Sequence, residues 1–171
     1  MYNMNNDLSK SAPADPARFE LWKALVRVER MLSAALEAKL EASEGIGLTG
    51  YEALDELHAA PGGRLRMNEL AASVILTPSG LTRLVDRLEI DGTVTRESCP
   101  TDGRGSHVRI TPKGVALLKR AEATYQLEVA RHFGARFTDT DALALKKACD
   151  HILASTRADT RSDTRADPIR R

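Results

Sequence analysis

Apolar residues recur every three or four positions over most of this chain, which is the period of an amphipathic α-helix. This pattern predicts six helices, at residues 16–43, 50–58, 68–74, 77–91, 112–136 and 139–155. Two stretches rich in β-branched residues lie between the fourth and fifth helices, at residues 93–98 and 106–111, and predict a β-hairpin with a tip of about seven residues. Leu65 to Met67 predict one further, very short strand.

Capping residues mark where several of these helices begin. Thr77-Pro78 combines an N-cap hydroxyl with a proline suited to the first helical turn. Thr49 with Glu52, and Thr138 with Asp141, have the spacing of a capping box, in which the hydroxyl and the carboxylate each accept an amide hydrogen of the other residue. We therefore expect helices to begin at about Gly50, Pro78 and Asp139.

The two ends of the chain lack this pattern. Residues 1–15 are polar, contain Pro13 and are followed by Pro16, so we expect a disordered leader. Residues 156–171 repeat Thr-Arg-x-Asp with almost no apolar side chain that a core could bury. We expect this segment to be a disordered tail.

The order of the elements predicts a mainly α fold with a small α+β hairpin. Short helices joined by a tight turn and followed by a hairpin form a winged helix-turn-helix, here over residues 62–111. The helices at 16–61 and 112–155 have apolar faces wider than this small lobe could cover. We therefore expect them to form a helical dimerisation lobe, with a monomeric helical bundle as the alternative.

The composition excludes several classes of protein. The chain has 171 residues and includes only seven Phe, Tyr and Trp residues, of which one is Trp. It contains no run of roughly 18 apolar residues and no secretory signal, so we expect a soluble, cytoplasmic and nucleoid-associated protein rather than a membrane protein. Because aromatic side chains are few, we also do not expect the chain to bind single-stranded nucleic acid by base stacking.

We find no sequence signature of a catalytic or metal site. The chain has no nucleophile elbow, P-loop or HExxH motif, so we do not expect an enzyme. Cys99 and Cys149 lie fifty residues apart without zinc-binding spacing, and the four histidines share no ligand spacing. We expect neither a metal nor a cofactor, and we interpret Cys149 as a small buried apolar residue.

The formal net charge of +1 conceals an uneven distribution along the chain. Residues 1–61 carry −4, residues 62–120 carry +4, residues 121–155 carry −1 and residues 156–171 carry +2. The basic segment coincides with the predicted winged helix. A polyanion such as DNA would bind there.

The predicted helix at 77–91 has one apolar stripe, so its other residues face outward. These are Ser79, Gly80, Thr82, Arg83, Asp86 and Arg87. A small, hydroxylated first turn followed by arginines suits insertion into the major groove of DNA. The alternative is a solvated face on which Arg83 pairs with Asp86, and Arg87 with Asp91.

The predicted hairpin tip carries one arginine, Arg104, between two glycines. Asp102 lies two residues before it and could orient its guanidinium. A single projecting arginine suits a narrow minor groove. Arg96 and Arg109 on the predicted strands add positive charge nearby, and the alternative for the tip is a purely structural turn.

Three sequence segments closely resemble the MarR family of bacterial transcriptional regulators. They are Leu70-Ala71, the helix segment Leu81-Thr82-Arg83-Leu84-Val85-Asp86-Arg87-Leu88-Glu89, and Asp102-Gly103-Arg104 leading to Ile110-Thr111-Pro112-Lys113-Gly114. The resemblance implies a homodimer that binds pseudo-palindromic double-stranded DNA, usually as a repressor. It also implies that Arg104 enters the minor groove, that Asp102 orients it, and that Ser79, Thr82 and Arg83 contact DNA from the recognition helix.

The resemblance further implies regulation by a small molecule. Members of the family commonly release DNA when a phenolic or carboxylate effector binds between the two lobes, or when a cysteine is oxidised. The candidate pocket residues here are Trp22, Val26, Tyr51, Leu54 and His58, each with ordinary core packing as the alternative. Cys99, at the base of the wing, is the candidate for oxidation.

Two other functions therefore remain as alternatives to an effector-responsive DNA-binding regulator. One is a winged-helix module for protein contact, in which Arg83 and Arg104 would pair with an acidic partner. The other is a redox-sensing regulator that acts through Cys99. The joint presence of the wing arginine and the hydroxylated recognition turn favours DNA.

Overall fold

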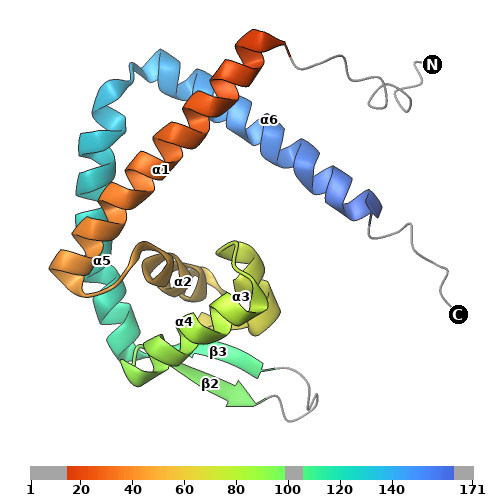
Figure 1. Ribbon diagram of the computed structural model, residues 1–171. Helices are drawn as coiled ribbons and strands as arrows, with labels where there is room; N and C mark the ends of the chain where they lie inside the picture. Colours follow the sequence, from red (N-terminus) through yellow and green to blue (C-terminus); the bar gives the residue numbers. More distant parts are fainter. Residues whose placement is uncertain (1–14, 99–105, 164–171) are drawn as a thin grey trace, which may run out of the picture. The chain divides into compact units, whose positions relative to one another are not determined.

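The computed structural model describes residues 15–98 and 106–163, and it divides into two compact units at Ala130 and Arg131 (Figure 1). The first unit holds a small antiparallel sheet and most of the helices. The second holds the short 3-10 helix η3 (Gly134–Arg136) and the helix α6 (Asp139–Asp163). None of the helices in the described residues has a stretch long and apolar enough to cross a membrane.

The helix α1 (Pro16–Glu44) matches the predicted range closely. The Asp15 carboxylate accepts a hydrogen bond from the Ala17 amide at 3.0 Å, and Pro16 occupies the first turn. Gly45 ends the helix with a φ of 70°, a left-handed conformation that glycine adopts without steric cost. Of the residues in α1, only Leu40 is buried in this chain.

The helix α2 (Leu48–Ala59) begins two residues before the predicted start. The capping box of Thr49 and Glu52 was a wrong prediction, because Thr49 already lies inside the helix and Gly47 is the N-cap. Instead, the carboxylate of Glu37 on α1 accepts the hydrogen bond of the Leu48 amide. Glu37, eleven positions before Leu48, thus caps the helix in place of Thr49.

The sheet has three antiparallel strands in the order β1-β3-β2. They are β1 (Arg64–Arg66), β2 (Val94–Ser98) and β3 (Ser106–Ile110), and Arg64 pairs with Arg109 while Val94 pairs with Ile110. The 3-10 helix η2 (Pro61–Gly63) leads into β1, and α3 (Met67–Ser73) follows it. The predicted hairpin is therefore confirmed, and the predicted short strand is displaced by one residue.

The helices α2, α3 and α4 (Pro78–Ile90) pack with the sheet around one hydrophobic core. Its fully enclosed side chains come from all of these elements and include Leu54, Leu57, Leu70, Leu81, Val85, Leu88, Val94 and Val108. Helices α3 and α4 lie beside the β2–β3 hairpin at one end of this unit (Figure 1). This arrangement is the predicted winged helix-turn-helix.

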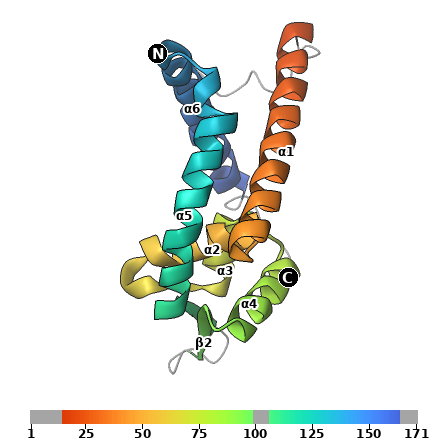
Figure 2. The ribbon, with the colours of Figure 1, turned by 90° about the vertical axis from the view of Figure 1, so that its left-hand side faces the viewer.

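The helix α5 (Pro112–His132) leads away from the winged lobe and ends four residues before the predicted end (Figure 2). Gly134 follows it in η3, and glycine is a poor residue for a helix interior. Leu118 and Ala121 on α5 are buried, whereas Val115 and Tyr125 are only partly buried. Glu44 at the end of α1 receives hydrogen bonds from Arg120 and Thr124 of α5, both at 3.3 Å.

The second unit differs from the sequence prediction at two points. The capping box of Thr138 and Asp141 forms, but α6 continues to Asp163, eight residues beyond its predicted end. Residues 156–163 contain no glycine or proline, and extending an existing helix costs far less than starting one. Cys149 is exposed in this chain rather than buried.

Candidate nucleic-acid interface

The helix α4 begins as its sequence predicts and presents a defined outer face. The Thr77 hydroxyl accepts a hydrogen bond from the Gly80 amide at 3.2 Å, and Pro78 occupies the first turn. Leu81, Val85 and Leu88 are at most 2% exposed and fix the helix on the core. The opposite face is therefore turned to solvent.

All four residues predicted to contact DNA from this helix are exposed. They are Ser79, Thr82, Arg83 and Arg87. The Ser79 hydroxyl lies 3.3 Å from that of Thr77, and the Thr82 hydroxyl donates to the Pro78 carbonyl at 2.9 Å. Both hydroxyls are thus held close to the helix and keep acceptor lone pairs for an outside group.

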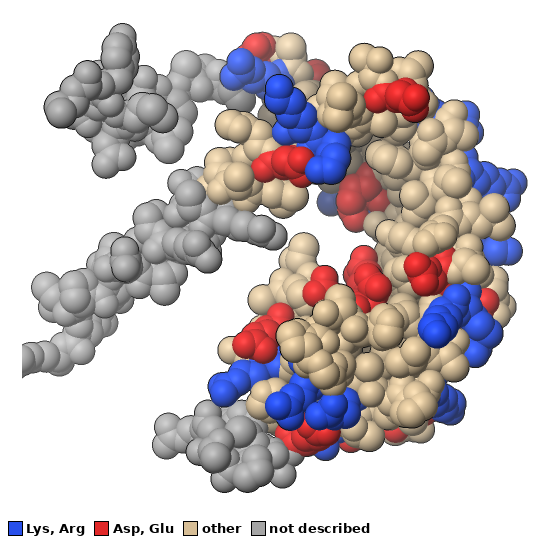
Figure 3. Space-filling model, turned by 180° about the vertical axis from the view of Figure 1, so that it is seen from behind, with Lys and Arg blue, Asp and Glu red and all other residues tan. Residues whose placement is uncertain are grey.

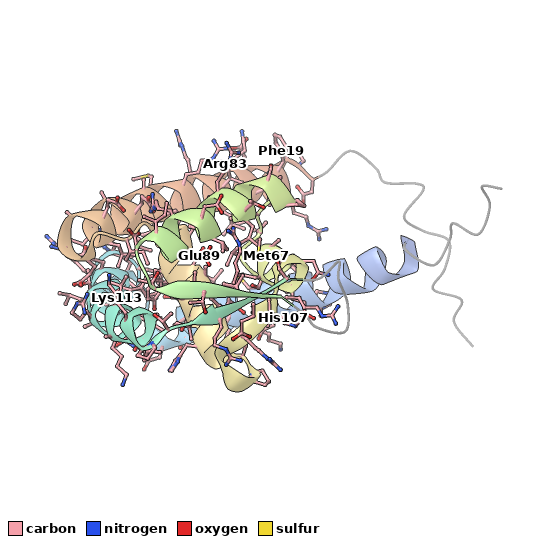
Figure 4. All side chains as sticks on the ribbon, turned by 90° about the horizontal axis from the view of Figure 1, so that it is seen from below. Phe19, Met67, Arg83, Glu89, His107 and Lys113 are labelled. Carbon is pink, nitrogen blue, oxygen red and sulfur yellow. The ribbon has the colours of Figure 1, made fainter. Side chains whose placement is uncertain are left out.

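The predicted ion pairs of Arg83 with Asp86 and of Arg87 with Asp91 do not form. The Asp86 carboxylate instead lies 2.5 Å from the guanidinium of Arg96 on β2. Within residues 15–98 and 106–163, neither Arg83 nor Arg87 has an ion pair or a side-chain hydrogen bond. Arg83 extends from the side of α4 away from β2, whereas Glu89 faces the strand (Figure 4).

Arg83 and Arg87 also line a hollow of about 290 Å³ beside the first turn of α2. Gly47, Thr49 and Gly50 form its other wall, together with the Glu37 carboxylate that caps α2. Two arginines and one carboxylate thus line this hollow beside a helix N-terminus.

Arg96 and Arg109 do not supply the free positive charge expected from the sequence. Arg96 contacts Asp86 and Glu89 of α4 at 2.5 and 3.1 Å and donates to the Thr82 carbonyl at 3.2 Å. Arg109 donates to the Glu97 carboxylate and to the Gly62 carbonyl, both at 2.5 Å. Basic and acidic side chains lie next to each other at the lower end of this unit (Figure 3).

The contact between Arg109 and Glu97 changes the pKa values of both groups. The hydrogen bond from Arg109 lowers the pKa of the Glu97 carboxyl below its ordinary value, and the same bond raises the pKa of Arg109.

Arg96 connects strand β2 to the recognition helix through Asp86 and Glu89, a role that the sequence analysis missed. The sequence does contain a signal for this contact: Asp86 and Glu89 are three positions apart on the helix, and Arg96 follows in the next strand.

The segment Thr111-Pro112-Lys113-Gly114 forms a tight joint between the end of α4 and the start of α5. The Thr111 hydroxyl donates to the Gly92 carbonyl at 2.8 Å, and the Lys113 ammonium donates to the Asp91 carbonyl at 2.6 Å. A Cβ atom on Gly114 would lie 2.2 Å from the Thr93 carbonyl oxygen. Only glycine allows this approach, so the motif fixes the recognition helix relative to α5.

The wing tip lies outside the described residues. Asp102 and Arg104, predicted to act in the minor groove, and Cys99, predicted as the oxidation site, all fall within residues 99–105. The strands that carry the tip are described as far as the pairing of Ser98 with Ser106.

The structure places the residues predicted for an effector pocket in different surroundings. Trp22 and Val26 line a hollow along α1, whereas Tyr51 lines another hollow between α2, the end of α3 and α5. Leu54 is fully buried in the core, and His58 is exposed and lines neither hollow.

Comparisons with known proteins agree with this geometry. A model of the MarR family matches residues 44–105, from the end of α1 to the wing. The fold resembles that of Sco3205, a MarR family transcriptional regulator from Streptomyces coelicolor solved in complex with DNA, with a TM-score of 0.77 and 28% identity over 85% of this chain and 91% of that one.

Two further structures show the same fold. AbsC, a MarR family transcriptional regulator from Streptomyces coelicolor, has a TM-score of 0.76 and 28% identity over 86% of this chain and 99% of that one. A mutant MarR from E. coli complexed with operator DNA has a TM-score of 0.70 and 21% identity over 83% of this chain and 99% of that one. The family match over residues 44–105 and the winged-helix fold together show that this chain is similar to transcriptional regulators of the MarR family.

Proposed function

We propose that this chain is a transcriptional regulator of the MarR family, a homodimer that binds pseudo-palindromic double-stranded DNA and represses transcription until a small effector releases it. The observation that carries the proposal is the outer face of α4, where Arg83 and Arg87 are exposed and have no partner within the described residues. The structure of the similar Sco3205 in complex with DNA supports the same role here.

The recognition helix enters the major groove with its N-terminal turn first. Ser79 and Thr82 are small enough for close approach, and Arg83 reaches base edges, where arginine commonly binds guanine. Arg87, one turn further along the helix, binds a backbone phosphate. Arg104 at the wing tip binds in the minor groove, and Asp102 orients it.

Apolar side chains on α1 support the homodimer. Its N-terminal half exposes Phe19, Leu21, Trp22, Val28 and Met31, each by 47% or more. Exposed apolar surface of this extent on one helix marks an interaction site. To reach successive major grooves, a twofold dimer must hold its two recognition helices about 34 Å apart.

The helix α6 of the second unit also exposes large apolar side chains. Leu143, Ile152 and Leu153 on α6 are exposed by 56% or more in the single chain. A partner copy that covers α6 would remove these side chains from water. An effector releases DNA only if it binds more tightly to the dimer conformation in which the distance between the two recognition helices does not fit the operator.

The test is the capture of DNA fragments from the organism's own genome by the purified chain. Bound fragments should share a pseudo-palindromic sequence, and affinity for one of them should fall by several decades between low and moderate salt. Sedimentation of the protein alone should give twice the mass of one chain. No fragment enriched at low salt would contradict DNA binding, and retention of an acidic protein instead would favour a protein-contact module.

A further inference from the structure

One threonine on the outer face of α4 is held in place at both its side chain and its backbone. The Thr82 hydroxyl donates to the Pro78 carbonyl at 2.9 Å, and the Thr82 carbonyl accepts a hydrogen bond from the Arg96 guanidinium at 3.2 Å. Arg96 is itself held by the carboxylates of Asp86 and Glu89, at 2.5 and 3.1 Å. Thr82 is therefore fixed within the chain, although it is exposed to solvent.

The bond to Pro78 determines what the Thr82 hydroxyl presents to a ligand. A carbonyl oxygen only accepts hydrogen bonds, so the hydroxyl uses its single hydrogen in this contact. The hydroxyl oxygen keeps lone pairs with which it can accept. Toward an outside group, Thr82 is thus a hydrogen-bond acceptor and not a donor.

The other residues predicted to contact DNA from this helix have a different character. The Ser79 hydroxyl lies 3.3 Å from the Thr77 hydroxyl, and either oxygen can be the donor, so Ser79 can present a hydrogen or a lone pair to a ligand. The guanidinium groups of Arg83 and Arg87 can only donate. Of these four exposed residues, Thr82 is the one that presents a fixed acceptor.

An acceptor of this kind distinguishes two classes of base in the major groove. Adenine and cytosine present an amino group there, whereas guanine and thymine present a carbonyl oxygen. The Thr82 oxygen accepts a hydrogen bond from an amino group, but two acceptors that face each other form no hydrogen bond. Every base pair has its amino group on one strand and its carbonyl oxygen on the other, so the contact also reads the orientation of the pair.

We infer that Thr82 determines specificity by requiring adenine or cytosine at one position of each half-site, on the strand that it faces. The inference rests on the proposed binding of DNA and adds the chemistry of one base contact to it. Arg83 supplies the opposite character, because its donors suit the acceptor atoms of guanine. Neighbouring residues of α4 thus read amino groups and carbonyl oxygens separately.

One hydrogen bond sets the size of this preference. To donate to the carbonyl oxygen of guanine or thymine, the Thr82 hydroxyl must first give up its bond to Pro78. A hydrogen bond of this kind changes an equilibrium constant about three- to tenfold. We expect that preference at one half-site, and about tenfold to a hundredfold when both half-sites are changed, because distant sites contribute independently.

The first experiment selects binding sites from randomised double-stranded DNA with the full chain and with two variants. The parent chain should enrich adenine or cytosine at one position of each half-site. Thr82→Val, which replaces the hydroxyl by a methyl group of similar size, should accept all four bases there within about twofold. Thr82→Ser keeps the hydroxyl and should keep the preference. Both variants should unfold like the parent, because Thr82 is exposed.

The matched control for Thr82→Val is Thr140→Val. Thr140 is an exposed threonine near the start of α6, in the second compact unit. The loss of its hydroxyl should leave the selected sequence unchanged. The same loss of base preference in the control would show that the effect does not come from the α4 face.

The second experiment removes the amino group of the base instead of the hydroxyl of the protein. In the selected site, purine replaces adenine, or pyrimidin-2-one replaces cytosine, and each analogue lacks only that amino group. The exchange should weaken binding of the parent about three- to tenfold more than binding of Thr82→Val, since the variant makes no contact that the analogue could remove. Comparison of the two proteins cancels the effect of the analogue on the duplex itself.

The outcomes separate this inference from the proposed function. Enrichment of guanine or thymine at the position that Thr82→Val alters would overturn the inference, as would an amino-base preference that Thr82→Val retains, or an analogue effect that is equal in both proteins. DNA binding stands in each of these cases. Failure of the parent chain to enrich any sequence would instead contradict the proposed binding of DNA, and the inference with it.

Discussion

Two pairs of arginines in the same basic segment have opposite environments. Arg83 and Arg87 on α4 have no partner within the described residues, whereas Arg96 and Arg109 on the strands are held by carboxylates and carbonyls. All four contribute equally to the formal charge of +4 over residues 62–120. The comparison shows that charge available to DNA depends on pairing, not on the number of arginines.

The physical origin of the difference is the position of the acidic residues. Asp86 and Glu89 on α4 face β2, and Glu97 on β2 faces Arg109 across the sheet. The strand arginines are therefore used to fix the wing to the recognition helix and to the rest of the lobe. The helix arginines lie on the opposite side, where no acidic residue of α4 reaches them.

The largest expected effect is on DNA affinity when both helix arginines are removed. Arg83→Ala with Arg87→Ala should cost about 2–4 kcal/mol of binding free energy, because a base contact and a phosphate contact are lost. The free energy of unfolding should change by less than about 0.5 kcal/mol, since neither side chain has an internal partner. Fluorescence anisotropy and urea unfolding measure the two quantities.

A matched control for this variant is Arg131→Ala. Arg131 is exposed near the end of α5, about 28 Å along the helix from Pro112 at its start. Its removal should leave affinity nearly unchanged. An equal loss of affinity in the control would show that general charge, rather than the α4 face, binds DNA.

The next effect concerns the wing tip. Arg104→Ala should cost about 1–3 kcal/mol of binding free energy and weaken the preference for A·T-rich flanks, because the narrow minor groove of such sequences attracts arginine. Competition between operator variants with A·T-rich and G·C-rich flanks measures the preference. If both affinity and preference survive, the minor-groove assignment of Arg104 is wrong.

Removal of a strand arginine should change stability rather than DNA contact. Arg96→Met leaves Asp86 and Glu89 without their cation, and since these carboxylates are 49% and 39% exposed, the cost in unfolding free energy is about 1 kcal/mol. Arg120→Met leaves the Glu44 carboxylate, which is only 14% exposed, with the Thr124 hydroxyl as its remaining donor, so a similar cost is expected. A larger loss of DNA affinity than of stability for Arg96→Met would contradict the distinction between the two arginine pairs.

The smallest effect is a dependence of stability on pH. Because the folded-state pKa of Glu97 lies below its usual value of 4.5, its contribution to stability is present above that value and is lost as the pH falls through the folded pKa. Thermal unfolding from about pH 6 to about pH 3 should therefore show a steeper loss in the parent than in Glu97→Gln. Parallel curves would mean that the bond with Arg109 does not persist in solution.

Local sequence features predicted most of the fold. The Thr77-Pro78 cap, the apolar stripe of Leu81, Leu84, Val85 and Leu88 and the two strands all depend on residues close together in the chain. All are present, with Leu84 only partly buried. The exposed positions of Ser79, Thr82, Arg83 and Arg87 follow from the same stripe. Periodicity alone therefore located the candidate interface on α4.

Features that depend on distant residues could not be predicted in this way. Glu37 caps α2 from eleven residues away, in place of the expected Thr49 cap. Asp86 forms its ion pair with Arg96 rather than with Arg83. The joint of Thr111 to Gly114 was recognised as a motif, but its contact with Thr93 required the structure. Tertiary contacts of this kind leave no periodic signal.

The most direct test of the account is the salt dependence of DNA binding in paired arginine variants. The slope of log affinity against log salt counts the cations that contact phosphate. Arg83→Ala with Arg87→Ala should reduce its magnitude by about 1 to 2, whereas Arg109→Met, measured where the protein is folded, should leave it unchanged. An unchanged slope for the helix variant together with a reduced slope for Arg109→Met would contradict the assignment of the free charges to α4.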